Sequence, residues 1–563
     1  MSFFHSDEKK PLVQKSLTFN SINGLNYTEN GKIIIEIPGE TAQFFSPSDS
    51  YLKFNVKIDT NSPDVNYLVQ LDPYLGSAIL IKDIRIYNLQ GVLLEELVNV
   101  NTLANIMEMY SDTQNNQNKH SLTTGQVLHN PEQSTWAPDG IRLEQSRETN
   151  SMYNPWFTKD ATGNATFNTV ACCLKLPSAI FSSRRIWANE IYGGLRVEII
   201  MSQNKDCFKL LRNASPTTIV GNAPSVIDSY YLPVVDHVAG GLQASGVPKA
   251  GALITSLFLG WKNNMSRTAQ RAPFCVGETV RLQDGAAFVE GTIAAINYTA
   301  IAGPSNQIEL VFTAAGMVRP LADIAAGTVV YSMGYSQRGA GKDPSFLVSD
   351  VSMVIQEIQP EPSYISAMEK SMRQNGGLSY KCHAWQNYRH SISSSENTAT
   401  VNLNILQHMA KALMVVPTSQ IATTLDGAIT QYGGGRTGIS GIMDTLTSLQ
   451  FFYAQKFQPD RPINTDLVSN EALEVFNGEF LCELEKSMAF FGIPASHTLL
   501  NLKKNMVYPR ALALMNQVVN LADSGDFQII CNYSAPVVSK LLNCWIAGIR
   551  EFKATPQGVV VTY

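Results

Sequence analysis

The chain has 563 residues, and its 42 lysines and arginines against 47 aspartates and glutamates give a formal net charge of −5. A slightly acidic chain argues against a protein whose main task is to neutralise a nucleic-acid backbone. At roughly 150 residues per domain, the length predicts about two to four domains. Hydrophobic residues make up 44% and charged residues only 16%, which excludes a disordered chain and suggests that much of the surface is neutral or covered by other copies.

The N-terminal residues 1–30 are polar and mixed, and we interpret them as an arm outside the core. Lys9, Lys10 and Lys15 in this arm are expected to face solvent or a neighbouring subunit rather than DNA. We expect neither an export signal nor a membrane-spanning helix, because the start of the chain lacks a long apolar run and the most apolar stretch, 232–261, is interrupted by charged residues.

The first half of the chain is dominated by alternating apolar and polar residues, which predicts β-strands with one buried face. A turn at 88–91 predicts a hairpin, and the spacing of Leu103, Ile106, Met107 and Tyr110 predicts one amphipathic helix behind a possible Asn101 cap. The predicted strands are 32–37, 51–59, 79–87, 92–97, 167–176 and 195–201.

The second half repeats this pattern. A helix is predicted from Pro362 to the Gly376-Gly377 pair, and a second one from about Asn470 to Phe490. The predicted strands are 346–358, 378–390, 400–406, 412–416, 449–457, 527–532, 541–552 and 559–563. A β-dominated unit that recurs after about 190 residues predicts two similar sandwiches in tandem.

Residues 203–345 interrupt this repetition, and their part from about Pro273 to Gly341 is rich in alanine and glycine. We interpret the segment as an insertion that includes a small β-barrel at about 268–340. The resulting division is an arm at 1–30, a first sandwich at 31–202 completed by 346–360, the insertion, and a second sandwich at 361–563. The expected fold is therefore all-β dominated, with two tandem eight-stranded sandwiches, a few accessory helices and an inserted small barrel.

No segment of the sequence carries a recognisable active site, so we predict no catalytic, cofactor-binding or metal-binding residue and no enzyme. Gly339 to Asp343 lacks the residues of a phosphate loop, and the glycines between Gly433 and Gly441 are best explained as a surface loop. His383 and His390, seven residues apart in one predicted strand, would face opposite sides.

The acidic pairs and the cysteines also have simple structural explanations. Glu95-Glu96 and the pair Glu483 and Glu485 are interpreted as solvated faces rather than acid–base pairs. The eight cysteines form no CxxC pair and are expected to be buried, reduced thiols, with the neighbours Cys172 and Cys173 on opposite faces of a strand.

Three stretches in this order resemble the double jelly-roll major capsid proteins of Polinton-like viruses, virophages and related double-stranded DNA viruses. The first is SAILIKDIRIYNLQGVLLEELVNVNTLANIMEMYSD, 77–112. The second pairs LKLPSAIF, 174–181, with GGLRVEII, 193–200, followed by FLVSDVSMVIQEIQPEP, 346–362. The third is SLQFFYAQKFQPDRPIN, 448–464, which leads into EFLCELEKSM, 479–488. The insertion at 203–345 departs from the family pattern.

The resemblance implies two upright eight-stranded jelly rolls per subunit and a homotrimer that forms a pseudo-hexameric capsomer of an icosahedral shell. It further implies a location in the virion, assembly inside the host cell, and contacts with neighbouring capsomers, penton and minor capsid or cement proteins. By the same analogy, residues 265–345 are expected to form an exterior tower that could contact the host surface. The alternatives are a jelly-roll assembly scaffold and a secreted carbohydrate-active or carbohydrate-binding protein on the same fold.

Overall fold

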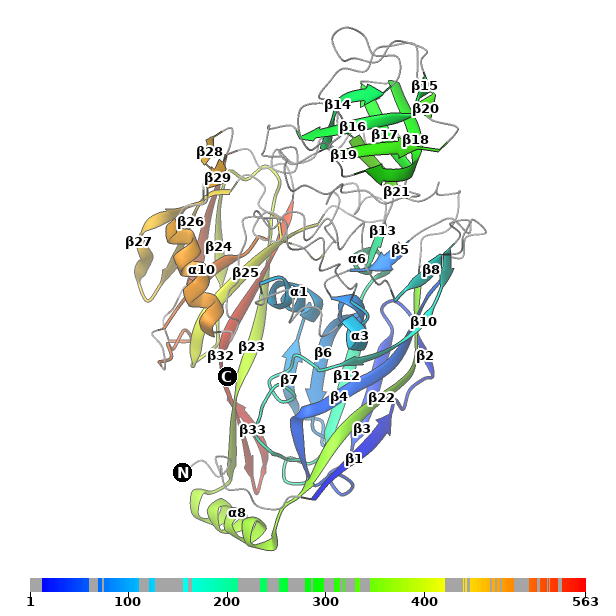
Figure 1. Cartoon of the computed structure of the whole chain (residues 1–563). Helices are drawn as coiled ribbons and strands as arrows, with labels where there is room; N and C mark the ends of the chain where they lie inside the picture. Colours follow the sequence, from blue (N-terminus) through cyan, green and yellow to red (C-terminus); the bar gives the residue numbers. More distant parts are fainter. Residues whose placement is uncertain are drawn as a thin grey trace.

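The computed structural model shows two β-sandwiches side by side and a smaller sheet above them (Figure 1). It describes residues 13–59, 69–72, 75–110, 121–126, 155–159, 165–210, 233–239, 253–261, 279–284, 287–297, 308–313, 317–318, 330–334, 345–420, 439, 441–442, 446–465, 468–470, 473–475, 478–490, 506–513, 517–523, 525, 527–534 and 539–562.

The first sandwich is built from two antiparallel sheets, here called sheet A and sheet B. Sheet A has the order β1 (Val13–Asn20), β22 (Ser345–Gln359), β4 (Phe44–Asp59), β10 (Thr169–Leu174). Sheet B has the order β3 (Lys32–Ile37), β12 (Leu195–Met201), β6 (Ile81–Tyr87), β7 (Leu93–Leu97). Alternate residues of each strand point into the space between the sheets, as the burial of Ile33, Ile35 and Ile37 in β3 shows.

The second sandwich is likewise built from two antiparallel sheets, sheet C and sheet D. Sheet C has the order β23 (Leu378–Ile392), β32 (Lys540–Thr555), β25 (Ala410–Ser419), β30 (Tyr508–Ala511), and β33 (Gly558–Thr562) pairs with the end of β32. Sheet D has the order β24 (Thr398–Leu403), β31 (Phe527–Tyr533), β26 (Leu446–Tyr453), β27 (Lys456–Asn464).

The eight main strands of each sandwich follow the same path. Numbered along the chain within each sandwich, they lie in the orders 1-8-3-6 and 2-7-4-5 in both halves. This wrapped order, with first and last strands adjacent, is that of a jelly roll. The predicted double jelly-roll fold is therefore confirmed.

Three elements differ from the sequence-based expectation. Residues 13–20, expected in the arm, form β1 and pair along their whole length with β22, so they supply the first strand of the first jelly roll. The predicted strand 449–457 is a hairpin of β26 and β27, which turns at Ala454 and Gln455 with φ of 51° and 61°. The predicted helix at 470–490 is shorter, because 473–475 form strand β29 and α10 spans Gly478–Phe490.

The helices lie at the sides and ends of the sandwiches. Helix α1 (Val100–Tyr110) lies between the two sandwiches, α10 lies along the outer side of the second, and α8 (Pro362–Asn375) lies at the lower end in Figure 1. Helix α8 has proline in its first turn and ends at Gly376 with φ of 63°, as its sequence predicts.

The insertion joins β12 to β22, the seventh and eighth strands of the first jelly roll. Its main sheet has the order β14 (Pro233–Ala239), β16 (Ser256–Trp261), β19 (Ile308–Phe312), β18 (Ala287–Asn297), β17 (Thr279–Asp284), β21 (Val330–Gly334). The two edge strands approach each other, which gives the sheet a barrel-like closure. The sheet is wider than the sequence predicts, because β14 and β16 precede residue 268.

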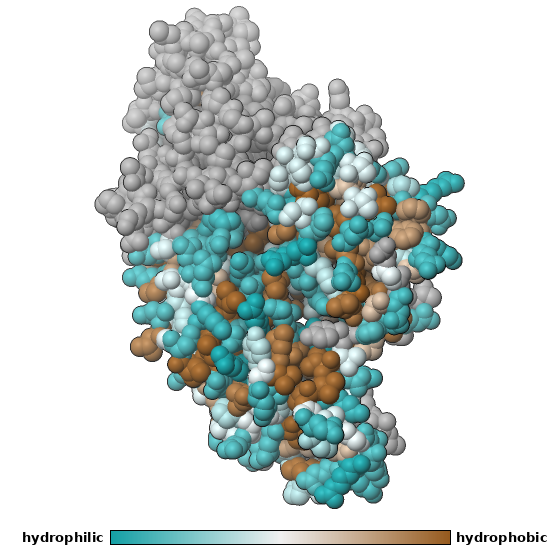
Figure 2. Space-filling view, turned by 180° about the vertical axis from the view of Figure 1, so that it is seen from behind, coloured by the Kyte–Doolittle hydropathy of each residue, from teal (hydrophilic) through white to brown (hydrophobic). Residues whose placement is uncertain are grey.

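The remaining elements are short connections. They are β2 (Asn26–Tyr27), β5 (Val69–Leu71), η1 (Gly76–Leu80), α3 (Ser121–Thr124), β8 (Phe157–Lys159), β9 (Ala165–Phe167), β11 (Trp187–Ala188), α6 (Asn204–Cys207), β13 (Phe208–Leu210), β15 (Leu253–Ile254), β20 (Met317–Val318), β28 (Val468–Asn470) and β29 (Leu473–Val475). Among the described residues, no helix is long and apolar enough to cross a membrane. Seen from behind, hydrophobic and hydrophilic residues alternate in patches over the sandwiches (Figure 2), in keeping with the low charge content.

Candidate functional site: the junction of the two sandwiches

The residues considered above as possible catalytic or metal-binding groups do not come together in one site among the described residues. In β23, His383 and His390 each have a direct partner in β32, so the strand pairing is continuous and the two side chains face opposite sides as predicted. Burial and the nearby Lys411 and Arg185 lower the pKa of His383. Among the described residues, no group of three or more histidine, cysteine or acidic side chains could hold a metal ion.

The two glycine-containing loops fall largely outside the described residues. This holds for Gly339 to Asp343 and for the glycines from Gly433 to Gly438. Gly441 is described, and its Cα lies so close to the backbone of Met506 that a Cβ atom would clash with it.

The cysteines are free thiols wherever the structure describes them. Cys172 is fully buried in β10 while its neighbour Cys173 is half-buried on the opposite face, as predicted. Burial raises the pKa of Cys172 to about 11. Cys482 on α10 is exposed, so the prediction of a buried thiol is wrong for this residue, and Cys275 lies outside the described residues.

The prediction of solvated faces is right for Glu96 and Glu485, which are exposed, and wrong for the other member of each pair. Glu95 is completely buried, because β7 turns its side chain inward while Glu96 points outward to Arg85. Glu483 of α10 is also buried, and its carboxylate lies 2.8 Å from the Arg510 guanidinium and 2.9 Å from the Lys486 ammonium. Both glutamates are parts of buried polar contacts that hold neighbouring elements together.

The junction between the sandwiches centres on four aromatic side chains. Trp187 and Tyr192 come from the first sandwich and stack with ring centroids 4.3 Å apart. Tyr380 and Phe552 come from the second and meet the Trp187 ring edge-on at 4.9 and 5.8 Å. All four are fully buried, and such offset and edge-on pairs stabilise the contact beyond the apolar area that they bury.

Hydrogen bonds cross the junction around this aromatic cluster. The Tyr192 hydroxyl donates to the backbone carbonyl of Leu378 at 3.2 Å, and the Tyr380 hydroxyl donates to that of Arg185 at 3.2 Å. Burial raises the pKa of both phenols, so these hydroxyls keep their protons at neutral pH. The two bonds tie the connection before β11 and the Tyr192 loop of the first sandwich to strand β23 of the second.

A buried charge lies beside the aromatic cluster. The Glu95 carboxylate accepts hydrogen bonds from the backbone N–H groups of Ala179 and Ile180 at 2.6 and 3.4 Å. Arg550 of the second sandwich is 2% exposed and donates to the carbonyl of Leu94 at 3.2 Å. Burial raises the pKa of Glu95, while the positive charge of Arg550 and the backbone donors oppose that rise. The Arg550 guanidinium thus offsets a charge buried in the other sandwich.

Helix α1 extends the junction along sheet C. Leu103 and Ile106 belong to the first half of the chain but pack into the hydrophobic core of the second sandwich. Asn99, just before the helix, donates to Asn543 of β32 at 2.8 Å. Register places Asn543 opposite Val416, on the face of sheet C that points away from sheet D. The first sandwich therefore covers an outer face of the second.

Side chains of the second sandwich likewise lie in the hydrophobic core of the first. Leu378, Tyr380, Phe552 and Ala554 belong to the second sandwich but lie in the hydrophobic core of the first. Each sandwich therefore shares a hydrophobic cluster with side chains of the other across the junction.

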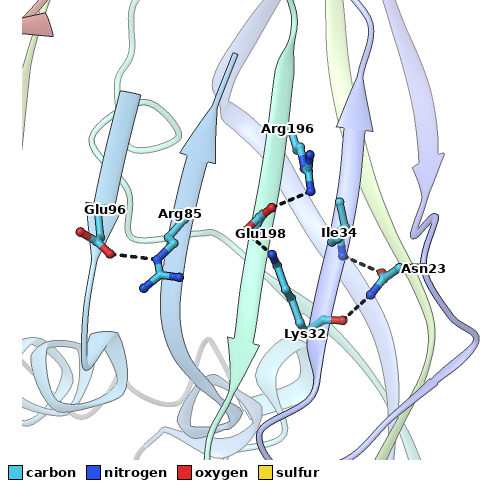
Figure 3. Close-up of polar contacts among 7 residues, drawn as sticks. All are labelled: Asn23, Lys32, Ile34, Arg85, Glu96, Arg196 and Glu198. Carbon is cyan, nitrogen blue, oxygen red and sulfur yellow. Dashed lines mark hydrogen bonds and ion pairs between the residues drawn. The ribbon is translucent and has the colours of Figure 1, made fainter. Parts of the chain in front are cut away.

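The outer face of sheet B, by contrast, carries paired charges (Figure 3). Glu198 accepts from Lys32 at 2.6 Å and from Arg196 at 2.9 Å, and Arg85 contacts Glu96 at 2.9 Å. Asn23 accepts from the Ile34 N–H at 2.8 Å and donates to the Lys32 carbonyl at 2.6 Å, which ties β3 to the preceding loop. Most of these ionic side chains are more than one-third exposed, as expected of a solvated sheet face.

No family model and no curated protein matches the sequence. Solved structures do match. The Faustovirus major capsid protein is 10% identical, with a TM-score of 0.48, over 98% of this chain and 92% of that chain. A chain of the Sputnik virophage is 9% identical, with a TM-score of 0.45, over 99% and 91%.

The mavirus major capsid protein is 9% identical to this chain, with a TM-score of 0.38, and the match covers 97% of this chain and 90% of that one. The Faustovirus and mavirus matches are major capsid proteins. The double jelly-roll fold itself is established by the strand order of the two sandwiches.

Proposed function

We propose that this chain is the major capsid protein of a double-stranded DNA virus and has a structural, non-catalytic role in the virion shell. The observation that carries the proposal is the repeated strand order, 1-8-3-6 and 2-7-4-5, in two sandwiches that share their cores. The likeness to Faustovirus, Sputnik and mavirus proteins accords with it.

The repetition has a direct geometric use. A hexagonal tile built from three copies needs each copy to supply two similar lobes at a fixed angle. The aromatic cluster around Trp187 and the Arg550–Glu95 neighbourhood would hold that angle, because both are fully buried between the lobes. Three copies would then form a pseudo-hexameric capsomer, and capsomers would meet one another, penton proteins and minor capsid or cement proteins in the shell.

The insertion is proposed to form a tower on the outside of the virion and to contact the host surface. It emerges between the seventh and eighth strands of the first jelly roll. In a jelly roll this connection lies at the same end as the one between the third and fourth strands, which in the second sandwich is the long connection between β25 and β26. A cryo-electron map of assembled particles tests the placement, and density for residues 233–334 on the inner side would contradict it.

The capsomer proposal is tested by measuring the solution mass of the purified full-length chain and imaging it in negative stain. We expect a mass of three chains and a hexagonal outline. A chain that stays monomeric at micromolar and higher concentrations would contradict the proposal. Detection of the chain in purified mature particles would separate a shell protein from a scaffold that leaves during maturation.

A further inference from the structure

Strand β24 forms one edge of sheet D and lacks the features that normally prevent an edge from pairing with another chain. Its sequence, Thr398–Leu403, contains no charged residue and no proline, which are the residues that proteins use for this purpose. The opposite edge of the same sheet has both, since β27 contains Lys456 and Arg461 together with Pro459 and Pro462. Sheet D is thus protected against further pairing at one edge and open at the other.

The backbone of β24 directs hydrogen-bonding groups away from the sheet. The carbonyl of Asn397 accepts from the Tyr533 N–H of β31 at 2.7 Å, which fixes the alternation along the strand. Every second residue from 397 onward therefore bonds to β31, while the N–H and C=O groups of Thr398, Thr400 and Asn402 point outward. These outward groups have no hydrogen-bond partner among the described residues. Such a row of groups is a template for a further strand.

The equivalent edge of the first jelly roll is closed by its own chain. Strand β3 occupies in sheet B the place of β24 in sheet D, since both are the second strand of their jelly roll. The Ile22 N–H donates to the carbonyl of Ile34 at 2.9 Å, and the Asn23 side chain accepts from the Ile34 N–H at 2.8 Å. The same side chain donates to the Lys32 carbonyl at 2.6 Å, so a loop takes the outward groups of this strand (Figure 3).

The second jelly roll has no such loop, because a shorter connection joins its first two strands. Residues 21–31 lie between β1 and β3, whereas only residues 393–397 lie between β23 and β24. There Ser393 and Ser395 form a tight turn, in which the Glu396 N–H donates to the Ser393 carbonyl at 3.4 Å. No part of this connection is left to run along β24, so a strand that pairs with its outward groups has to come from elsewhere.

We propose that β24 pairs with β24 of a second copy of this chain, antiparallel and centred on Thr400, so that sheet D continues across the contact. In this register the N–H and C=O groups of Thr400 bond to those of Thr400 in the second copy. Those of Thr398 bond to those of Asn402, and the reverse pair follows from the two-fold axis. All the outward groups of both strands are then satisfied.

The sequence of the edge favours a second copy as the partner. Around a two-fold axis a charged side chain at the centre would meet itself, which is destabilising. Here the exposed side chain of Thr400 would lie beside its own copy, and Thr398 beside Asn402, and these uncharged side chains can hydrogen-bond to one another. Glu396, the one charged residue between positions 391 and 410, would lie opposite Asn404 rather than another acid.

The inference rests on the proposed function, because it names how capsomers would meet. A ring of three copies joins different surfaces head to tail, so a contact between identical surfaces cannot form within it and must join two capsomers. A strand of this length is about 20 Å long. Pairing along its edge buries far less than the roughly 1,200 Å² of a stable interface. A single contact is therefore weak, and the shell gains stability from its repetition.

Disulfide trapping tests this register. All variants carry Cys482→Ser, which removes the exposed thiol of α10. Thr400→Cys puts a thiol directly opposite its own copy, at a Cα separation of about 5.5 Å that a disulfide can span. Thr398→Cys is the matched control, because it lies on the same exposed side of β24 but opposite Asn402. The purified full-length variants are oxidised at high protein concentration, the linked positions are identified by mass spectrometry, and thermal unfolding confirms that each variant is folded.

We expect Thr400→Cys to form at least about ten-fold more linked dimer than Thr398→Cys. The double variant Thr398→Cys with Asn402→Cys should link position 398 of one copy to position 402 of the other. Adding Thr400→Pro to this double variant removes the central outward N–H and should abolish the link, although proline is tolerated at the edge of a sheet. Adding Thr400→Val instead keeps the N–H and should preserve the link.

The outcomes separate this contact from the capsid function. Equal linking of the two single variants, or a link from position 400 to any other position, would overturn the proposed pairing. If the unaltered chain forms the three-chain species and Thr400→Cys does not link, the β24 contact is wrong and the capsid function stands. If the chain is monomeric without oxidation and still links specifically through position 400, the contact stands and the capsomer proposal fails.

Discussion

The buried Glu95 and Arg550 allow a quantitative test of how the two sandwiches are held together. The perturbation is Arg550→Met, which replaces a 2%-exposed guanidinium by an apolar side chain of similar length. Glu95 then stays buried without its neighbouring positive charge. Removing one partner of a buried pair costs about 3–5 kcal/mol, and we expect about 3 kcal/mol because Ala179 and Ile180 still donate to the carboxylate.

The pH dependence gives the sign of the effect. Burial raises the pKa of Glu95 above its ordinary value, and Arg550 lowers it, so removing Arg550 raises it further. A raised pKa means that the folded protein binds this proton more tightly than the unfolded chain, and the contribution of Glu95 to stability is lost as pH rises through the folded pKa. The deficit of Arg550→Met should therefore be large at neutral pH and shrink in acid.

The assay is chemical unfolding of the wild type, Arg550→Met, Glu95→Gln and the double variant at several pH values. The double variant should regain much of the stability lost by Arg550→Met, because no buried charge remains. The matched control is Glu96→Gln, whose carboxylate is 42% exposed and pairs with Arg85, and we expect it to change stability by less than about 1 kcal/mol. A deficit that is independent of pH and unchanged in the double variant would refute the reasoning.

Three further predictions concern the rest of the fold. Trp187→Ala should lower the free energy of unfolding by about 3–5 kcal/mol, because it leaves a cavity against Tyr192, Tyr380 and Phe552. In the same denaturation assay the control Val560→Ala, at a 53%-exposed site, should have little effect. Gly548→Ala should destabilise sheet C, since a Cβ atom there would clash with Gln407 and Met409, and thermal unfolding would detect it. Replacing residues 211–344 by a short flexible linker should change the thermal unfolding midpoint by no more than a few degrees from that of the unaltered chain, since the insertion has its own main sheet. A much lower midpoint would show that the insertion stabilises the sandwiches.

The sequence predicts the fold well where strand-forming runs have a clear end. Strand β3 coincides with its predicted range, 32–37, because its β-branched isoleucines favour a strand and Pro38-Gly39 follows directly. The hairpin at Ala454 and Gln455 was missed since neither residue is a typical turn former, although both adopt positive φ. The start of α10 was misplaced because Leu473 lies at helical spacing from Phe476 and Phe480, but in the structure it pairs with Asn470 in a short hairpin.

The candidate site was harder to predict, because its residues meet only through tertiary structure. Glu95 was interpreted as solvated, yet the sequence contained a signal. Adjacent residues of a strand face opposite sides, so Glu95 and Glu96 could not both be solvated if one face of β7 was buried. Its neighbour Arg550 lies 455 positions further along the chain, and no local pattern connects them.

The exchange of core residues explains how the junction could fix the angle between the two sandwiches. If each sandwich had a complete core of its own, the two lobes would meet through a separate surface and could move relative to each other. Here Leu103 and Ile106 of the first half lie in the core of the second, while Tyr380 and Phe552 of the second lie in the core of the first. Any change in the angle between the lobes would open both cores at once. The angle is therefore set by the same close packing that stabilises each sandwich, and it is this fixed angle that would let three chains close a six-lobed ring.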